Sequence, residues 1–174
     1  GALRLRGRLV PEVQARVWTA LVARHEALRT VFTTVDGQPV MRVLPSAALE
    51  FDQQDLSASP VDEHEALIRT RALEYMARPF DIERGPLWRV CLLRLAEDHH
   101  VSVVSMHHLV SDHWSMTILT GEFCRLYTAF VQGQPIELPS LPVQYVDYAV
   151  AQRAWIDGPR LQAPVDYWRR QLAD

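Results

Sequence analysis

The chain has 174 residues, of which 48% are hydrophobic and 22% charged, a composition typical of a globular protein with one domain or two small ones. Its net charge of −3, with basic residues scattered along the chain, excludes the positive surface that nucleic-acid binding needs. No apolar run reaches membrane-spanning length and no signal-peptide core opens the chain, so we expect a cytoplasmic protein that does not contact a membrane.

The first half of the chain predicts strands and helices in alternation. The expected strands cover residues 3–10, 30–35 and 39–44, with a short one beginning at Phe51. Asp36-Gly37 suits the tight turn of a hairpin between the second and third of them. The expected helices begin at Pro11, where proline's missing N–H costs nothing, and at Val61. The second should end at Arg78 and bury a stripe of Ala66, Leu67, Ala72, Leu73 and Met76.

The second half predicts a long hairpin followed by helices. The expected strands are residues 87–95 and 101–108, joined by a turn at 96–98. The expected helices are residues 114–131, 143–156 and 162–172, and a proline-rich connector covers 136–142. The first of these helices should bury Ile118, Leu119, Phe123, Leu126, Tyr127 and Phe130. This mixture of hairpins and helices predicts an α/β fold of the α+β sandwich type, with helices packed on a mixed β-sheet.

Polar residues gather where the strand expected over 101–108 ends. Because side chains alternate along a strand, His107 and His108 should face opposite sides and serve different purposes. Imidazole transfers protons near neutral pH, so a histidine here could deprotonate a nucleophile that attacks a carbonyl group. The structural alternative for the histidine is a buried core residue. For Asp112 the structural alternatives are the N-cap of the following helix and a buried ion pair that orients a neighbouring group.

Other candidate sites are weaker. Five histidines fall between residues 99 and 113, but Val110 stands where the nearest dinuclear metal pattern needs a ligand, and no converging set for zinc can be named. His99 and His100 are expected in a solvated turn, and His64 on a polar helix face. The cysteines, Cys91 and Cys124, are interpreted as buried thiols in a reducing compartment. The C-terminal aromatic residues are expected to pack between helices, namely Tyr145, Tyr148, Trp155, Tyr167 and Trp168.

Four segments resemble the condensation domains of nonribosomal peptide synthetases. Met106-His-His-Leu-Val-Ser-Asp-His-Trp-Ser115 is similar to the family signature His-His-x-x-x-Asp-Gly-Trp-Ser. The other three are Arg24-His-Glu-Ala-Leu-Arg-Thr-Val-Phe32, Phe80-Asp-Ile-Glu-Arg-Gly-Pro-Leu-Trp-Arg89, and Tyr145-Val-Asp-Tyr-Ala-Val-Ala-Gln-Arg153 with Tyr167-Trp168 after it. They occur in the family's order across nearly the whole chain, which makes the match specific.

The resemblance implies a fold, a reaction and partners. The family has two lobes of chloramphenicol-acetyltransferase-like fold, and residues 1–174 match most of the N-terminal lobe as a single domain. From the resemblance we expect the family's opening segment, before Leu3, and its C-terminal lobe to be absent from this chain. The complete domain joins a donor acyl or peptidyl thioester to the amine of an acceptor aminoacyl thioester. Both substrates ride on phosphopantetheine arms of peptidyl carrier proteins, no cofactor or metal is bound directly, and the isolated fragment is expected to be inactive.

The resemblance also implies roles for individual residues. His108 would act at the reaction centre, either deprotonating or positioning the amine, and His107 would support the loop. Asp112 would hold that loop through an arginine, which is either Arg29 or an arginine of the second lobe. The residues expected to border the substrate channel are His113, Trp114 and Ser115.

His113 departs from the family pattern, which has glycine at this position. Glycine allows unusual backbone dihedrals and a close approach of substrate, so the replacement bears on the geometry of the acceptor side.

Two other functions stay open. One is a non-catalytic docking module that recruits a carrier protein or a partner enzyme. The other is a related acyltransferase that uses a coenzyme A thioester.

Overall fold

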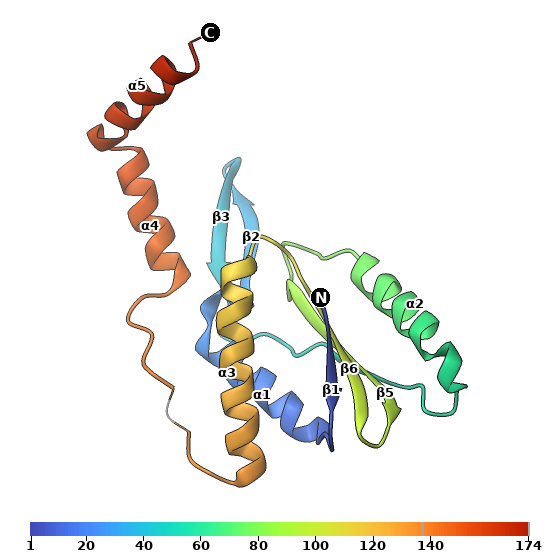
Figure 1. Ribbon diagram of the computed structural model, residues 1–174. Helices are drawn as coiled ribbons and strands as arrows, with labels where there is room; N and C mark the ends of the chain where they lie inside the picture. Colours follow the sequence, from blue (N-terminus) through green and yellow to red (C-terminus); the bar gives the residue numbers. More distant parts are fainter. Residues whose placement is uncertain (137, 174) are drawn as a thin grey trace. The chain divides into compact units, whose positions relative to one another are not determined.

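In a computed structural model, which describes residues 1–136 and 138–173, the chain forms two compact units, Gly1–Pro139 and Ser140–Asp174. The strands of the first unit are β1 (Ala2–Arg6), β2 (Thr30–Val35), β3 (Gln38–Val43), β4 (Phe51–Asp55), β5 (Trp88–Ala96) and β6 (His99–Met106). Its helices are α1 (Pro11–Arg24), α2 (His64–Ala77) and α3 (His113–Gln132), with short 3-10 helices η1 (Glu26–Arg29) and η2 (Val61–Glu63) (Figure 1). None of the helices described is long and apolar enough to cross a membrane.

The main sheet has the strand order β1-β6-β5-β4. The β1–β6 and β6–β5 pairs are antiparallel, whereas β4 and β5 run parallel. The sheet is therefore mixed, and the predicted fold class is confirmed. The β2–β3 hairpin forms a separate sheet of two strands, in which Asp36 and Gly37 have φ values of 50° and 74° and make the predicted turn.

Each face of the main sheet packs on helices (Figure 1). One core joins α1 and α3 to Trp88, Val90 and Val104. The other core joins α2 to alternate residues of the same strands, including Cys91 and Val103. Because β5 and β6 are covered on both faces, they are almost continuously buried.

The buried face of α2 differs from the predicted one. The helix buries Ile68, Ala72 and Tyr75, whereas Leu73 and Met76 of the predicted stripe are exposed. The helix is only weakly amphipathic in sequence, so the sheet that it meets decides which side turns inward. His64, expected on a polar face, is buried and its Nε2 lies 3.0 Å from the carbonyl oxygen of Ser59.

Three further predictions were wrong. His99 and His100 belong to β6 and not to a turn, and His100 is only 3% exposed in this central strand, which is buried along most of its length. Burial lowers the pKa of His100 below its ordinary value. Cys124 is exposed on α3, whereas Cys91 is buried as predicted. Ile118 of the same helix is also exposed.

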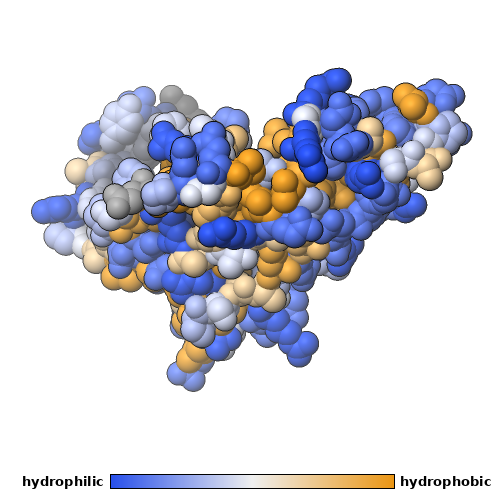
Figure 2. Space-filling model, turned by 90° about the horizontal axis from the view of Figure 1, so that it is seen from below, coloured by the Kyte–Doolittle hydropathy of each residue, from blue (hydrophilic) through white to orange (hydrophobic). Residues whose placement is uncertain are grey.

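The second unit consists of α4 (Tyr145–Ile156), the 3-10 helix η3 (Pro159–Leu161) and α5 (Gln162–Gln171). Taken by itself, this unit has no buried residue in α4 or α5, and its aromatic rings contact each other in two pairs, Tyr145 with Tyr148 and Tyr167 with Trp168. Exposed hydrophobic residues occur elsewhere too, and Figure 2 shows a group of them between hydrophilic residues on one face.

Candidate active site

The site is a tight turn that begins where β6 ends. The strand ends at Met106, so the alternation of side chains between the two faces, which was expected to continue to His108, does not include either histidine. The N–H of His107 still donates to the carbonyl of Leu87 at 2.8 Å, which ties the turn to β5. The carbonyl of His107 then accepts bonds from the Val110 N–H at 3.0 Å and the Ser111 hydroxyl at 3.2 Å. His107 therefore anchors the turn on the sheet.

The two neighbouring imidazoles are held in opposite tautomers. Nδ1 of His107 lies 3.1 Å from the backbone N–H of Leu109, which can only donate, so the proton of the neutral ring sits on Nε2. Nδ1 of His108 lies 3.2 Å from the carbonyl oxygen of Ser111, which can only accept, so this ring carries its proton on Nδ1. The lone pair of His108 is thus on Nε2, and the residue is exposed. His107 is half-buried.

Asp112 is the N-cap of α3, as one of the two structural alternatives predicted. Its Oδ1 accepts a hydrogen bond from the Ser115 N–H at 2.7 Å, and the Ser115 hydroxyl accepts one from the Asp112 N–H at 2.7 Å. These two bonds form a capping box. The hydrogen bonds from Ser115 to the carboxylate lower the pKa of Asp112. The Ser115 hydroxyl is consequently used in the cap.

The remaining predicted channel residues occupy the first turn of α3. His113 is the first residue of the helix and Trp114 is 75% exposed. Among the residues that the structure describes, Asp36 is the one non-glycine residue with a positive φ, so the backbone at His113 does not require glycine. The His113 ring adds bulk at an exposed position beside the turn.

Arg29 lies with other partners. It donates to the carbonyl oxygen of Leu44 at 2.6 Å and to the carboxylate of Glu26 at 3.2 Å. The hydrogen bonds that the structure gives for the Asp112 carboxylate come from Ser115. The predicted pairing of Asp112 with Arg29 is therefore not formed here, and an arginine from a second lobe stays a prediction.

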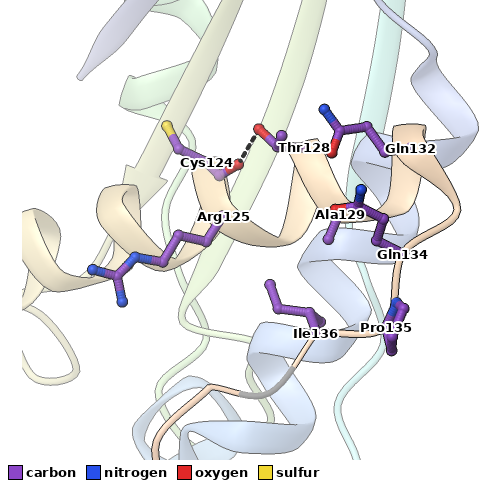
Figure 3. A pocket seen from close by; sticks show the side chains of 8 residues that line it. All are labelled: Cys124, Arg125, Thr128, Ala129, Gln132, Gln134, Pro135 and Ile136. Atoms are coloured by element: carbon purple, nitrogen blue, oxygen red, sulfur yellow. Dashed lines mark hydrogen bonds between the residues drawn. The ribbon is translucent and has the colours of Figure 1, made fainter.

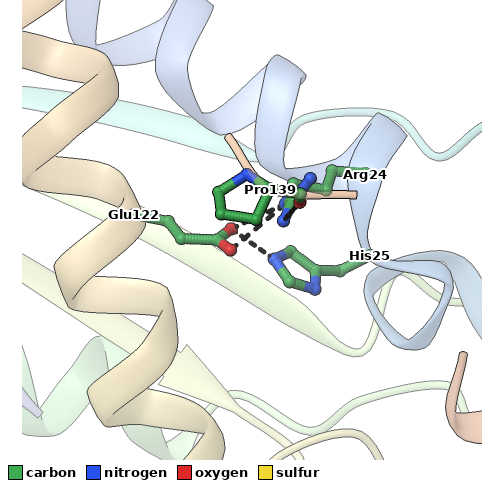
Figure 4. A network of polar contacts seen from close by, with 4 residues as sticks. All are labelled: Arg24, His25, Glu122 and Pro139. Atoms are coloured by element: carbon green, nitrogen blue, oxygen red, sulfur yellow. Dashed lines mark hydrogen bonds and ion pairs between the residues drawn. The ribbon is translucent and has the colours of Figure 1, made fainter. Parts of the chain in front are cut away.

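A polar network fixes α3 against the end of α1 (Figure 4). Nε of Arg24 donates to both carboxylate oxygens of Glu122 at 3.1 Å, and Nε2 of His25 lies 2.6 Å from the same carboxylate. Arg24 also donates to the carbonyl oxygen of Pro139 at 2.5 Å. Sequence reasoning placed Arg24 and His25 in a matched segment but missed Glu122, because nothing local distinguishes this glutamate from others on a helix.

A groove runs beside the C-terminal half of α3 (Figure 3). It has a volume of about 450 Å³ and is lined by Cys124, Arg125, Thr128, Ala129, Gln132, Gln134, Pro135 and Ile136. Since helical residues rise 1.5 Å each, Cys124 lies about 18 Å along the axis from Asp112. The groove is therefore separate from the histidine turn. Over residues 1–136 and 138–173, no group of three His, Cys, Asp or Glu side chains converges as a metal site would require.

Comparison with known proteins identifies the family. The sequence profile of the condensation domain matches residues 1–174, and the chain belongs to the condensation domain family. It is 44% identical over 173 residues to malpibaldin synthetase of Mortierella alpina, covering 99% of this chain and 3% of that protein. It is 39% identical over 172 residues to phosphinothricin tripeptide synthetase PhsB of Streptomyces viridochromogenes, covering 99% of this chain and 14% of that protein. The chain thus spans a small part of these relatives.

Solved structures agree in fold. SgcC5 protein from Streptomyces globisporus superposes with a TM-score of 0.84 at 27% identity, over 99% of this chain and 39% of that one. The X-domain in its complex with OxyB from teicoplanin biosynthesis gives a TM-score of 0.82 at 29% identity, over 99% of this chain and 37% of that one. The predicted resemblance to condensation domains is confirmed.

Proposed function

We propose that this chain supplies the catalytic histidine for amide-bond formation in nonribosomal peptide synthesis. The observation that carries the proposal is the tautomer of His108. Its Nδ1 is engaged by the Ser111 carbonyl, so the basic lone pair on Nε2 belongs to an exposed ring in the turn that follows β6. A base held in this way can accept a proton from an amine without first rearranging.

The reaction joins the amine nitrogen of the acceptor to the thioester carbonyl carbon of the donor. The C–N bond forms, the C–S bond breaks, and the thiolate of the donor arm leaves. The proton lost by the amine passes to Nε2 of His108 and from there to the departing sulfur. The Ser111 carbonyl stabilises the imidazolium in between, because it accepts a hydrogen bond from Nδ1.

The substrates proposed for this reaction are carrier-bound. A donor and an acceptor peptidyl carrier protein would each deliver a phosphopantetheine thioester, and a second lobe of the same domain would form the opposite wall of the channel. The coverage of 39% of the SgcC5 chain supports the second lobe, since most of that solved chain lies outside the match. His113 and Trp114 are exposed beside the turn, where they would border the acceptor.

A docking module is the second candidate. It is favoured by the likeness to the X-domain, which was solved in complex with OxyB. The histidine turn argues against it here, because a module that only binds a partner does not need His108 in a fixed tautomer.

The test is peptide-bond formation from loaded carrier proteins by the complete condensation domain. His108→Ala should lower the rate by about 100-fold or more, the usual scale for a general base. His99→Ala, at the start of β6 and far from the histidine turn along this strand, is the matched control and should keep its activity. Unchanged product formation by a folded His108→Ala variant would refute the role of His108. A wild-type domain that binds carrier or partner enzyme without making product would establish the docking function instead.

A further inference from the structure

Arg89 is an arginine buried on the α2 side of the main sheet, and only 4% of it is exposed. Its two terminal nitrogens donate to the carbonyl oxygens of Arg78 at 3.0 Å and Pro79 at 2.8 Å. Oε2 of Glu50 lies 3.7 Å from Nε, and within residues 1–136 and 138–173 Nε makes no hydrogen bond. A buried cation is costly unless it is compensated, so a position of this kind calls for a reason.

The guanidinium group lies over an aromatic ring that leads to the site. Its central carbon is 3.9 Å from the centroid of the Phe80 ring, within the range of a cation–π interaction. The Phe80 ring in turn meets the His107 imidazole edge to face, with centroids 6.1 Å apart and planes at 80°. Arg89, Phe80 and His107 thus form one continuous stack from the sheet to the histidine turn, hereafter the cation stack.

Backbone hydrogen bonds hold the segment that follows Phe80. The carboxylate of Asp81 accepts from the N–H groups of Glu83 and Arg84 at 3.0 and 3.2 Å. The carbonyl of Ile82 accepts from the N–H of Phe32 at 2.8 Å, which ties the segment to β2. Phe80 is therefore not on a loose loop, and its ring can transmit the position of Arg89.

His107 passes this position on to His108. Its carbonyl holds Val110 and Ser111, and the carbonyl of Ser111 in turn faces Nδ1 of His108. The His107 ring itself is bonded to the turn, because its Nδ1 accepts from the Leu109 N–H at 3.1 Å, so a shift of the ring moves the turn that orients the His108 imidazole.

We propose that Arg89 and Phe80 are positioning residues for the amide-forming reaction. They fix the His107 ring and, through the turn built on its carbonyl, the direction in which His108 presents Nε2. This positioning role rests on the proposed function, because its effect is on the rate of amide formation. The contact between the Phe80 and His107 rings can be measured without that reaction.

The first readout is the NMR signal of the His107 ring in the full-length domain labelled with ¹³C at histidine Cε1, assigned by its loss in His107→Gln. Phe80→Leu and Arg89→Lys should each shift this signal, because leucine has no ring and lysine lacks the planar fork that contacts both carbonyls and the ring. Phe80→Tyr keeps the ring and should leave the signal near its wild-type position. Arg94→Lys is the matched control, since Arg94 lies on the same strand in an exposed pair with Asp55.

The second readout is the rate of amide formation. Phe80→Leu and Arg89→Lys should lower kcat by roughly 10- to 100-fold with KM for the acceptor carrier unchanged, the scale expected when a reacting group is misplaced by up to 1 Å. Phe80→Tyr keeps the aromatic ring, so its kcat should stay near the wild-type value. The Phe80 variants keep the test decisive if Arg89→Lys does not fold.

The outcomes separate the two proposals. A His107 signal that stays in place in Phe80→Leu overturns the positioning role alone, and so does a shifted signal with an unchanged kcat. Full activity of His108→Ala in the same assay overturns the proposed function and the positioning role together.

Discussion

Replacing Glu122 by glutamine should destabilise the fold, because this carboxylate joins three parts of the chain. It accepts from Arg24 through both oxygens, it contacts His25, and Arg24 reaches on to Pro139. The side chains of Glu122, Arg24 and His25 are only 12%, 18% and 19% exposed. Glutamine keeps the shape of the side chain but removes its charge, so the change isolates the electrostatic part of the network.

The expected loss is about 2–3 kcal/mol in the free energy of unfolding. Removing one partner of a fully buried ion pair costs about 3–5 kcal/mol, and the residual exposure of this network lowers that value through solvent screening. For a chain of this length, about 1 kcal/mol corresponds to roughly 2–4 °C in Tm. The variant should therefore melt roughly 4–12 °C below the wild type.

Thermal unfolding followed by circular dichroism measures the effect, with Glu74→Gln as the matched control. Glu74 forms an exposed i,i+3 pair with Arg71 at 3.0 Å, a class of contact that contributes about 1 kcal/mol or less. A Tm of Glu122→Gln no lower than that of Glu74→Gln would show that solvent screens the network fully and that it does not hold α3 in place.

Three further predictions concern titration and exposure. Hydrogen bonds from Ser115 lower the pKa of Asp112, so the stability that the carboxylate provides is present above its unfolded value of about 3.9 and is lost as the pH falls through the lower folded value. Asp112→Asn should keep the cap at pH 7, and its free energy of unfolding in urea should fall less at acid pH than that of the wild type. An equal fall in both proteins would contradict this. Burial lowers the pKa of His100, so stability should be complete above about pH 6.5 and fall as the pH drops towards the folded value, because the unfolded chain then binds the extra proton. His100→Gln should flatten the stability profile below about pH 6.5, and an equal slope in both proteins would exclude His100 as its source. Burial raises the pKa of the Cys91 thiol to about 11, whereas Cys124 is exposed, so a thiol reagent at pH 8 should label Cys124 in the folded chain and Cys91 only after unfolding. Rapid labelling of both, seen by mass spectrometry, would contradict the burial of Cys91.

The sequence by itself determined the features that depend on near neighbours. Pro11 begins a helix and Asp36-Gly37 closes a hairpin as predicted. Asp112 caps α3 as one alternative proposed. Each depends on contacts within about four residues, and the preferences of a few side chains decide such contacts. The matched segments also identified the family, because they carry its residue types in order.

The tertiary structure decided everything that depends on distant neighbours. The buried side of α2, the burial of His100 in a central strand, and the parallel pairing of β4 with β5 follow from which surfaces meet. The cation stack and the Glu122 network likewise join residues far apart in the chain. Such contacts form only when packing repays the entropy of closing long loops, and no local pattern in the sequence records which partners that packing selects.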